Sequence, residues 1–217
     1  MALPEDRCRL VLIVPDGEDE AALAEELGHA LRGGDVASVI IPQYGLNDSA
    51  FQARAEKLVP IVQAVGAAAL ICGDSRIAGR VKADGLHLTG SLEELGEAIE
   101  KFTPKLIVGS AAAKDRHAAL EVGELRPDYI FFGRIDGDIK PEAHPKNLAL
   151  AEWWASMVEI PCITMGGTQL ASVEEVAATG AEFVALREAV FSNPAGAAAA
   201  VAEANAILDE KAPRFDA

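Results

Sequence analysis

Short apolar runs of strand length recur along this chain, and stretches with helical periodicity separate them. The eight runs cover residues 8–14, 36–41, 67–72, 84–88, 105–108, 128–132, 161–165 and 182–186. Most of them are continuous rather than alternating, as is typical of parallel strands that are buried on both faces. The pattern therefore predicts repeated βα units built around a parallel sheet.

The boundaries of the predicted helices carry start and stop signals. The clearest helical stretches are residues 18–32, 49–65, 91–101, 146–158 and 172–179. We expect Ser49, Ser91 and Ser172 to be N-caps, and a Glu three residues after Ser91 and Ser172 predicts a capping box in both places. Gly66 and Gly180 follow helical stretches, where a left-handed residue often ends a helix.

Eight βα units in 217 residues fit a closed (β/α)8 barrel, with residues 1–217 forming a single domain. Right-handed crossovers place each helix outside the sheet, and the last strand can then pair with the first. An open doubly wound sheet is the alternative. It would leave two edges to protect, and the dinucleotide-binding motif Gly-x-Gly-x-x-Gly is absent after the first run, where residues 14–18 read Val-Pro-Asp-Gly-Glu.

Charge and cysteine content limit the classes of partner and the cellular compartment that we expect. The net charge of −15 repels nucleic acid and anionic membranes over a Debye length of about 8 Å, although backbone N–H groups can still hold a small phosphate. Cys8, Cys72 and Cys162 show no CxxC or metal-like spacing, so we expect buried thiols in a reducing compartment. The opening residues lack a secretory signal, and no apolar run reaches the roughly 18 residues of a membrane helix. We expect a cytoplasmic protein without nucleic-acid or membrane partners.

In such barrels the ligand binds where the strands end, so the residues after each run are the candidates. Gly166 and Gly167 follow the seventh run and Arg187 follows the eighth, which predicts a phosphate cup, with a tight turn as the alternative for the glycines. His87 lies within the fourth run, either as a neutral imidazole that points into the barrel or as a core group.

Two further segments carry polar side chains. Asp74 and Arg76 follow the third run, as a capping pair or as ligands for a metal or a polar substrate. The irregular stretch 133–145, which includes Arg134 and Lys140, suits a lid over a pocket or a solvated loop. The adjacent Trp153 and Trp154 are expected to pack against a helix or a subunit.

Four segments together resemble the thiamine phosphate synthase family and its thiazole tautomerase (TenI) relatives, over nearly the whole chain. They are residues 83–88 (ADGLHL), 127–133 (PDYIFFG), 161–167 (PCITMGG) and 180–186 (GAEFVAL). Members of the family join hydroxymethylpyrimidine diphosphate to a thiazole phosphate. The resemblance implies a role in thiamine biosynthesis, a small phosphorylated heterocycle as ligand, and Mg²⁺ as cofactor.

The resemblance also implies roles for single residues. It implies metal binding and a catalytic role for Asp74, a catalytic role for Lys140 and phosphate binding by Gly166 and Gly167. We further expect His87 to be catalytic, Arg187 to bind phosphate, and the substrate to be bound by Arg76, Ser110 and Arg134. The family's diphosphate-gripping pattern Gln-x-Arg-x-Lys is missing, since residues 40–44 read Ile-Ile-Pro-Gln-Tyr.

Other family positions differ as well. Leu92 replaces a second magnesium carboxylate, Glu188 replaces a phosphate-binding serine, Asp138 stands in the family's Thr-x-Thr-Lys segment, and Ala112 lies near the position of the tautomerase histidine. These departures argue against standard synthase activity.

The sequence thus leaves three hypotheses open. The first is a thiamine phosphate synthase-like transferase, the second is a non-catalytic ligand-binding or regulatory barrel, and the third is another phosphate-binding barrel such as an isomerase of aromatic amino-acid synthesis. The third requires an acid/base pair that we do not find. Apolar residues on the predicted helices lead us to expect a homodimer.

Overall fold

The computed structural model describes residues 6–215, and within them eight parallel strands close into a barrel in chain order. The last strand pairs with the first, so the open-sheet alternative is excluded. The strands are β1 Arg9–Ile13, β2 Ser38–Pro42, β3 Ala68–Cys72, β4 Gly85–Leu88, β5 Ile107–Ser110, β6 Tyr129–Phe132, β7 Cys162–Met165 and β8 Phe183–Leu186. The predicted (β/α)8 barrel is confirmed. The expectation about a secretory signal concerns residues 1–5, which lie outside the described residues. The two ends of the predicted domain, residues 1–5 and 216–217, lie outside them as well.

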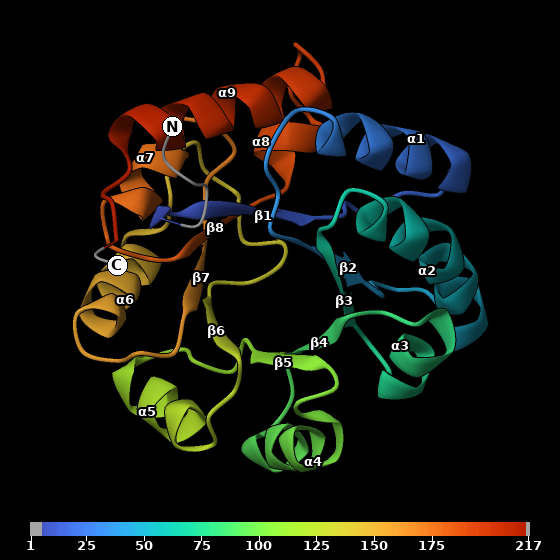
Figure 1. The fold of residues 1–217 in the computed structure, drawn as a ribbon, viewed down its shortest axis with the longest axis horizontal. Helices are drawn as coiled ribbons and strands as arrows, with labels where there is room; N and C mark the ends of the chain where they lie inside the picture. Colours follow the sequence, from blue (N-terminus) through green and yellow to red (C-terminus); the bar gives the residue numbers. More distant parts are fainter. Residues whose placement is uncertain (1–5, 216–217) are drawn as a thin grey trace.

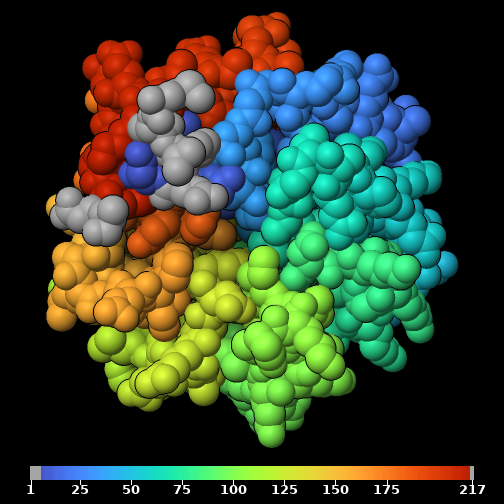
Figure 2. Space-filling model, in the orientation of Figure 1, coloured from blue at the N-terminus to red at the C-terminus, as the bar shows by residue number. Residues whose placement is uncertain are grey.

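Helices surround the strands (Figure 1) and follow one another in chain order around the molecule, so that the first and last units lie side by side (Figure 2). In residues 6–215 they are α1 Glu20–Leu31, α2 Asp48–Gln63, α3 Ser75–Val81, α4 Leu92–Phe102, α5 Arg116–Glu124, α6 Pro145–Ala155, α7 Ser172–Ala177, α8 Glu188–Phe191 and α9 Ala197–Lys211. None of these helices combines the length and apolar character needed to cross a bilayer.

The helix starts match the sequence expectation in one case of three. Ser91 caps α4, with a complete capping box to Glu94. For α2 the expected Ser49 is wrong, because Asn47 is the N-cap and its side chain accepts the N–H of Ala50. Ser172 is also wrong as a cap, because it is the first helical residue of α7 and its hydroxyl is used by the preceding turn.

Side chains alternate between the inside of the barrel and the layer under the helices. The ring of Tyr129 fills the inside next to Gly109, where an added Cβ would overlap it. The inner cluster consists of Val11, Ile13, Ile40, Leu70, Tyr129, Phe131, Ile163, Met165 and Ala185. The barrel is therefore a packed core, and a ligand can approach only from its ends.

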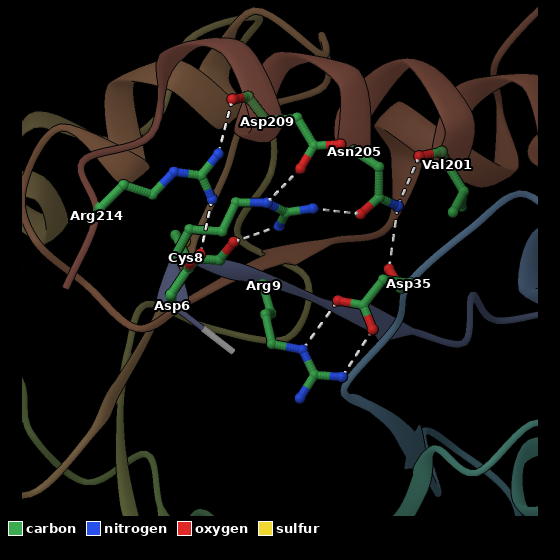
Figure 3. A network of polar contacts seen from close by, with 9 residues as sticks. Asp6, Cys8, Arg9, Asp35, Val201, Asn205, Asp209 and Arg214 are labelled. Carbon is green, nitrogen blue, oxygen red and sulfur yellow. Dashed lines mark hydrogen bonds and ion pairs between the residues drawn. The ribbon is translucent and has the colours of Figure 1, made fainter. Parts of the chain in front are cut away.

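A polar network joins α9 to the start of β1 and so connects the last βα unit to the first (Figure 3). The buried Arg7 guanidinium donates to Asp209 at 2.8 Å and to the Asn205 side-chain oxygen at 3.2 Å. Asn205 in turn donates to the carbonyl of Asp35 at 3.0 Å, and Arg9 binds the Asp35 carboxylate with two hydrogen bonds. The first and last βα units are thus held by partly buried hydrogen bonds as well as by the β1–β8 ladder.

The three cysteines form no disulfide. Cys8 and Cys162 are buried, as expected, and Cys72 is half-buried at the end of β3. Burial raises the pKa of the Cys72 thiol to about 11, so this cysteine is a protonated thiol at neutral pH.

Candidate functional site

A pocket of about 610 Å³ opens where several strands end. Residues that follow β2, β3 and β6 line one side, and α4 lines the other. Gln43, Tyr44 and Ile135 line the pocket from the loops after β2 and β6, while His87 contributes from within β4. The pocket therefore lies at the C-terminal mouth, the end of the barrel at which the sequence predicts ligand binding.

His87 is fully buried at this pocket and pairs with Tyr129 of β6. Its Nδ1 lies 2.7 Å from the Tyr129 hydroxyl, and its ring makes an edge contact with Phe131 at 5.0 Å between centroids. Burial lowers the pKa of His87 to about 4, and burial also raises the pKa of Tyr129 well above its usual value. Both groups are therefore neutral at pH 7.

The Nε2 atom of His87 has no hydrogen-bond partner among the described residues. Donation from the Tyr129 hydroxyl to Nδ1 uses the phenol proton, and the neutral ring then carries its own proton on Nε2. A buried N–H without an acceptor costs about 1–3 kcal/mol. A ligand that presents an acceptor to this nitrogen, once the side chains that cover it move aside, would recover that cost.

The depressed pKa of His87 predicts a stability change with pH. The unfolded chain takes up this proton near pH 6.5 and the folded chain only near pH 4, so stability falls as the pH drops through that window. The His87 contribution to the loss is about 3 kcal/mol by pH 4. Denaturant unfolding of the wild type and of His87→Gln across this range measures it as the difference between the two. Parallel curves for both proteins would contradict the assignment.

The expected phosphate cup at Gly166 and Gly167 is closed, because the amides of this turn are already bonded within the chain. Gly166 N–H donates to the Ala185 carbonyl at 2.9 Å, and Gly167 N–H donates to the Ser172 hydroxyl at 2.8 Å. The next amide, of Thr168, donates to the Lys140 carbonyl at 2.8 Å. The alternative prediction of a tight turn describes this segment better.

Arg187, the cation expected in that cup, is paired with a carboxylate from another loop. Its Nε and Nη2 lie 3.0 and 2.7 Å from Oδ1 of Asp138, whose side chain is 0% exposed. The other Asp138 oxygen accepts the N–H of Glu188 at 2.8 Å. An internal anion thus occupies the place beside Arg187 at which the sequence predicts a ligand's phosphate.

The glycine pair has a packing role in this arrangement. A Cβ on Gly167 would overlap the backbone of Pro141, so glycine lets the 138–143 segment lie directly on the turn after β7. Gln169 N–H donates to the Pro141 carbonyl at 3.2 Å, and Ala143 N–H donates to Glu175 at 2.9 Å. Residues 138–143 of the segment predicted to be a lid are therefore anchored to the turn after β7 and to α7.

Asp74 and Arg76 form a local capping pair. The Asp74 side chain caps α3 and accepts hydrogen bonds from the Arg76 guanidinium, and these bonds lower the pKa of the carboxyl to about 2. Residues 6–215 contain no group of three or more His, Cys, Asp or Glu side chains placed to hold a metal ion. With both Asp74 oxygens engaged by Arg76, the residues present do not fit the magnesium site that the resemblance implies.

The remaining predicted site residues do not converge on the pocket. Ser110 follows the outward-facing Val108 and the inward Gly109 in β5, so alternation places its side chain on the outer face, where it accepts the N–H of Ala112. Arg134 is exposed and pairs with Asp136, and Lys140 is exposed. The structure thus does not bring these three side chains together, and their role in substrate binding stays a prediction.

Sequence reasoning missed three side chains that contact or border the predicted site residues. Tyr129 is the partner of His87, and Asp138 is the partner of Arg187. Tyr44, at the pocket rim, donates to the Val14 carbonyl at 2.7 Å, and burial raises the pKa of its hydroxyl to about 12, with the nearby Arg187 opposing the shift. Alternation in β6, which turns Tyr129 and Phe131 to one face, was the available signal for the first of them.

Comparison with known proteins gives consistent matches over most of the chain. A family model described as thiamine monophosphate synthase matches residues 10–190. The thiamine-phosphate synthase of Rhodospirillum centenum is 35% identical over 205 residues, which cover 93% of this chain and 98% of the relative. That of Hyphomonas neptunium is 32% identical over 217 residues, covering 97% of this chain and 98% of the relative.

Solved structures agree on the fold. Thiamine phosphate pyrophosphorylase from Pyrococcus furiosus superposes with a TM-score of 0.78 at 22% identity, covering 95% of this chain and 98% of the other. A 3-hexulose-6-phosphate synthase superposes with a TM-score of 0.69 at 19% identity, covering 91% and 99%. At these identities the superpositions show the shared barrel.

Proposed function

Because the chain belongs to the thiamine monophosphate synthase family, which supports a role in thiamine biosynthesis, we propose that its barrel mouth binds a pyrimidine- or thiazole-type heterocycle of that pathway. One observation supports this most. The buried Nε2 of His87 has no partner in the described part of the chain, and His87 lines a pocket of about 610 Å³. That volume is within the range of small-molecule sites, about 300–1,000 Å³.

The chemistry of the pocket suits an aromatic heterocycle. With Tyr129 donating to Nδ1, the neutral imidazole offers an N–H donor at Nε2, and ring nitrogens of a pyrimidine or thiazole are acceptors of matching type. Cys72 and Ile135, which line the pocket and pack on the inner cluster, add apolar surface against which a flat ring can lie. The ligand would thus be oriented by one hydrogen bond and otherwise held by apolar contact.

Calorimetry with hydroxymethylpyrimidine and with the hydroxyethylthiazole tests this proposal. We expect the wild type to bind at least one of them, and His87→Phe to weaken that binding about tenfold or more, because the N–H donor is lost while the ring is kept. His117→Phe, at an exposed position on α5, is the matched control. Equal binding by His87→Phe, or no binding of either compound by the wild type, would overturn the proposal.

A non-catalytic ligand-binding or regulatory role is the second candidate. The observation in its favour is the engagement of Asp74 by Arg76, since synthase chemistry as the family performs it uses magnesium carboxylates. A steady-state assay with both phosphorylated substrates and Mg²⁺ separates the two roles. Magnesium-dependent product favours the transferase, and binding without product favours the binder. A homodimer and a cytoplasmic location remain predictions.

A further inference from the structure

A second pocket, of about 310 Å³, lies at the end of the barrel opposite the mouth. Five of the residues that line it are each the first residue of a strand: Ser38, Ala68, Ile107, Tyr129 and Phe183. Because the eight strands are parallel, these residues mark the N-terminal end of the barrel. We call this space the N-terminal pocket.

We propose that the N-terminal pocket is a second ligand site, for a small neutral aromatic molecule with an N–H group, and that Tyr129 couples this site to His87 at the mouth. The inference goes beyond the proposed function, because it concerns the other end of the barrel and a different ligand. A molecule bound there would act as an effector of the mouth.

The first support is the apolar part of the lining. Leu70, Tyr129 and Ile163 are buried and form the deep part of the pocket, and the half-buried Ile107 and Phe183 surround them. The rings of Tyr129 and Phe183 offer surfaces on which an aromatic ligand can stack. The volume lies at the lower end of the range of small-molecule sites, about 300–1,000 Å³. Size and lining together suit a ligand of one or two rings.

The polar part of the lining determines the charge and the polar group of the ligand. Asp128 and Arg9 both line the pocket, so an anion would be repelled by the carboxylate and a cation by the guanidinium. Asp128 accepts the N–H of Val108 at 2.7 Å through Oδ2, and a carboxylate can accept further hydrogen bonds. The hydroxyl of Ser38 is another acceptor in the lining. A neutral ring that carries an N–H donor matches this set.

The second support is the position of Tyr129, which contributes to both pockets. Its ring lines the N-terminal pocket, and its hydroxyl lies 2.7 Å from Nδ1 of His87. His87 in turn lines the pocket at the mouth. The hydrogen-bonded pair of Tyr129 and His87 therefore lies between the two pockets.

The packing of the Tyr129 ring gives the coupling its physical basis. The ring lies directly against Gly109, where an added Cβ would overlap it. A close-packed interior transmits small displacements rather than absorbing them. A ligand that contacts the ring from the N-terminal pocket thus alters the hydrogen bond to His87 and the environment of its imidazole. By thermodynamic linkage, a ligand at the mouth would change the affinity of the N-terminal pocket by the same factor.

An NMR titration of the full chain with aniline, a neutral ring with an N–H donor, tests both parts of the inference. Methyl resonances of Leu70, Ile107 and Ile163 report the N-terminal pocket, and the imidazole ¹⁵N resonances of His87 report the mouth. We expect saturable shifts of the three methyl groups with a Kd of about 1 mM or tighter. The His87 resonances should follow the same titration curve, whereas the exposed imidazole of His117 on α5 should not move.

Two variants separate the site from the coupling. Ala68→Phe places a ring in the N-terminal pocket from the start of β3, so the methyl shifts and the His87 shifts should both disappear. Tyr129→Phe keeps the ring and removes the hydroxyl, so the methyl shifts should remain while the His87 shifts are lost. Ala206→Phe, at an exposed position on α9, is the control and should titrate as the wild type does. If Ala68→Phe fails to fold, Ala68→Leu takes its place.

Three results would overturn the inference. The first is a wild type without saturable methyl shifts, and the second is a wild type in which the methyl groups shift but His87 does not. The third is a His87 shift that persists in the folded Ala68 variant or in Tyr129→Phe, because aniline would then reach the imidazole by another route. The titration uses no ligand of the mouth, so its failure and the failure of the proposed function are separate outcomes.

Discussion

Replacing Trp154 with alanine is expected to lower the free energy of unfolding by about 4 kcal/mol. The indole is 1% exposed, packs against Phe132 of β6 with 6.0 Å between ring centroids, and donates from Nε1 to the Ile160 carbonyl at 2.7 Å. Truncation leaves a large cavity between α6 and the barrel and a carbonyl without its donor. Urea denaturation followed by circular dichroism measures the loss.

Trp153→Ala is the matched control, one residue away on the same helix. Trp153 is half-buried and lies under the Arg116 guanidinium of α5, with 5.1 Å from the guanidinium carbon to the ring centroid. We expect this variant to lose only about 1–2 kcal/mol, because part of the indole is already in contact with water. Equal losses at the two positions would show that α6 does not face the barrel as described.

Gly109→Ala is expected to destabilise the barrel by about 3 kcal/mol and to abolish ligand binding at the mouth. An added Cβ would overlap the Tyr129 ring inside the barrel, so the ring has to shift away from its place in the inner cluster. Moving Tyr129 breaks its hydrogen bond to His87 and turns the imidazole away from the pocket. Denaturant unfolding and the calorimetric titration of the proposed ligand report the two effects separately.

Gly79→Ala provides the comparison for this substitution. Gly79 lies within α3, and a Cβ there meets no atom within 4 Å. Alanine in a helix interior is favoured over glycine by about 0.5–1 kcal/mol, so this variant should be slightly more stable than the wild type and should bind ligand equally. A Gly109→Ala protein with unchanged stability and binding would contradict the packing of Tyr129 across the barrel.

Two carboxylates in the loops after β3 and β6, of which the sequence assigns only Asp74 to ligand chemistry, bind arginines of the chain. Asp74 pairs with Arg76, two residues along, and that local pair was one of the readings that the sequence left open. Asp138 pairs with Arg187, 49 residues along, and no local pattern predicts that contact. The two contacts differ in the sequence separation of their partners. A cap depends on neighbouring residues, whereas a contact between two loops depends on the path of both over the barrel mouth.

The sequence alone determined the architecture of this protein. Continuous apolar runs at regular spacing require parallel strands buried on both faces, and eight such runs with intervening helices satisfy their hydrogen bonds best by closing. The approximate strand positions, the capping box at Ser91 and the location of the mouth follow from the same local rules. Each of these features depends on residues close together in the chain.

Only the tertiary structure decided what the mouth contains. His87 meets Tyr129 across 42 residues and Arg187 meets Asp138 across 49, so neither pair has a signature in local spacing. Strand register and the path of the loops determine which side chains lie close together. A buried polar group then forms its hydrogen bond with a partner within reach. The physical reason is that periodicity specifies which face a side chain occupies, while the closed barrel specifies which distant side chain it finds there.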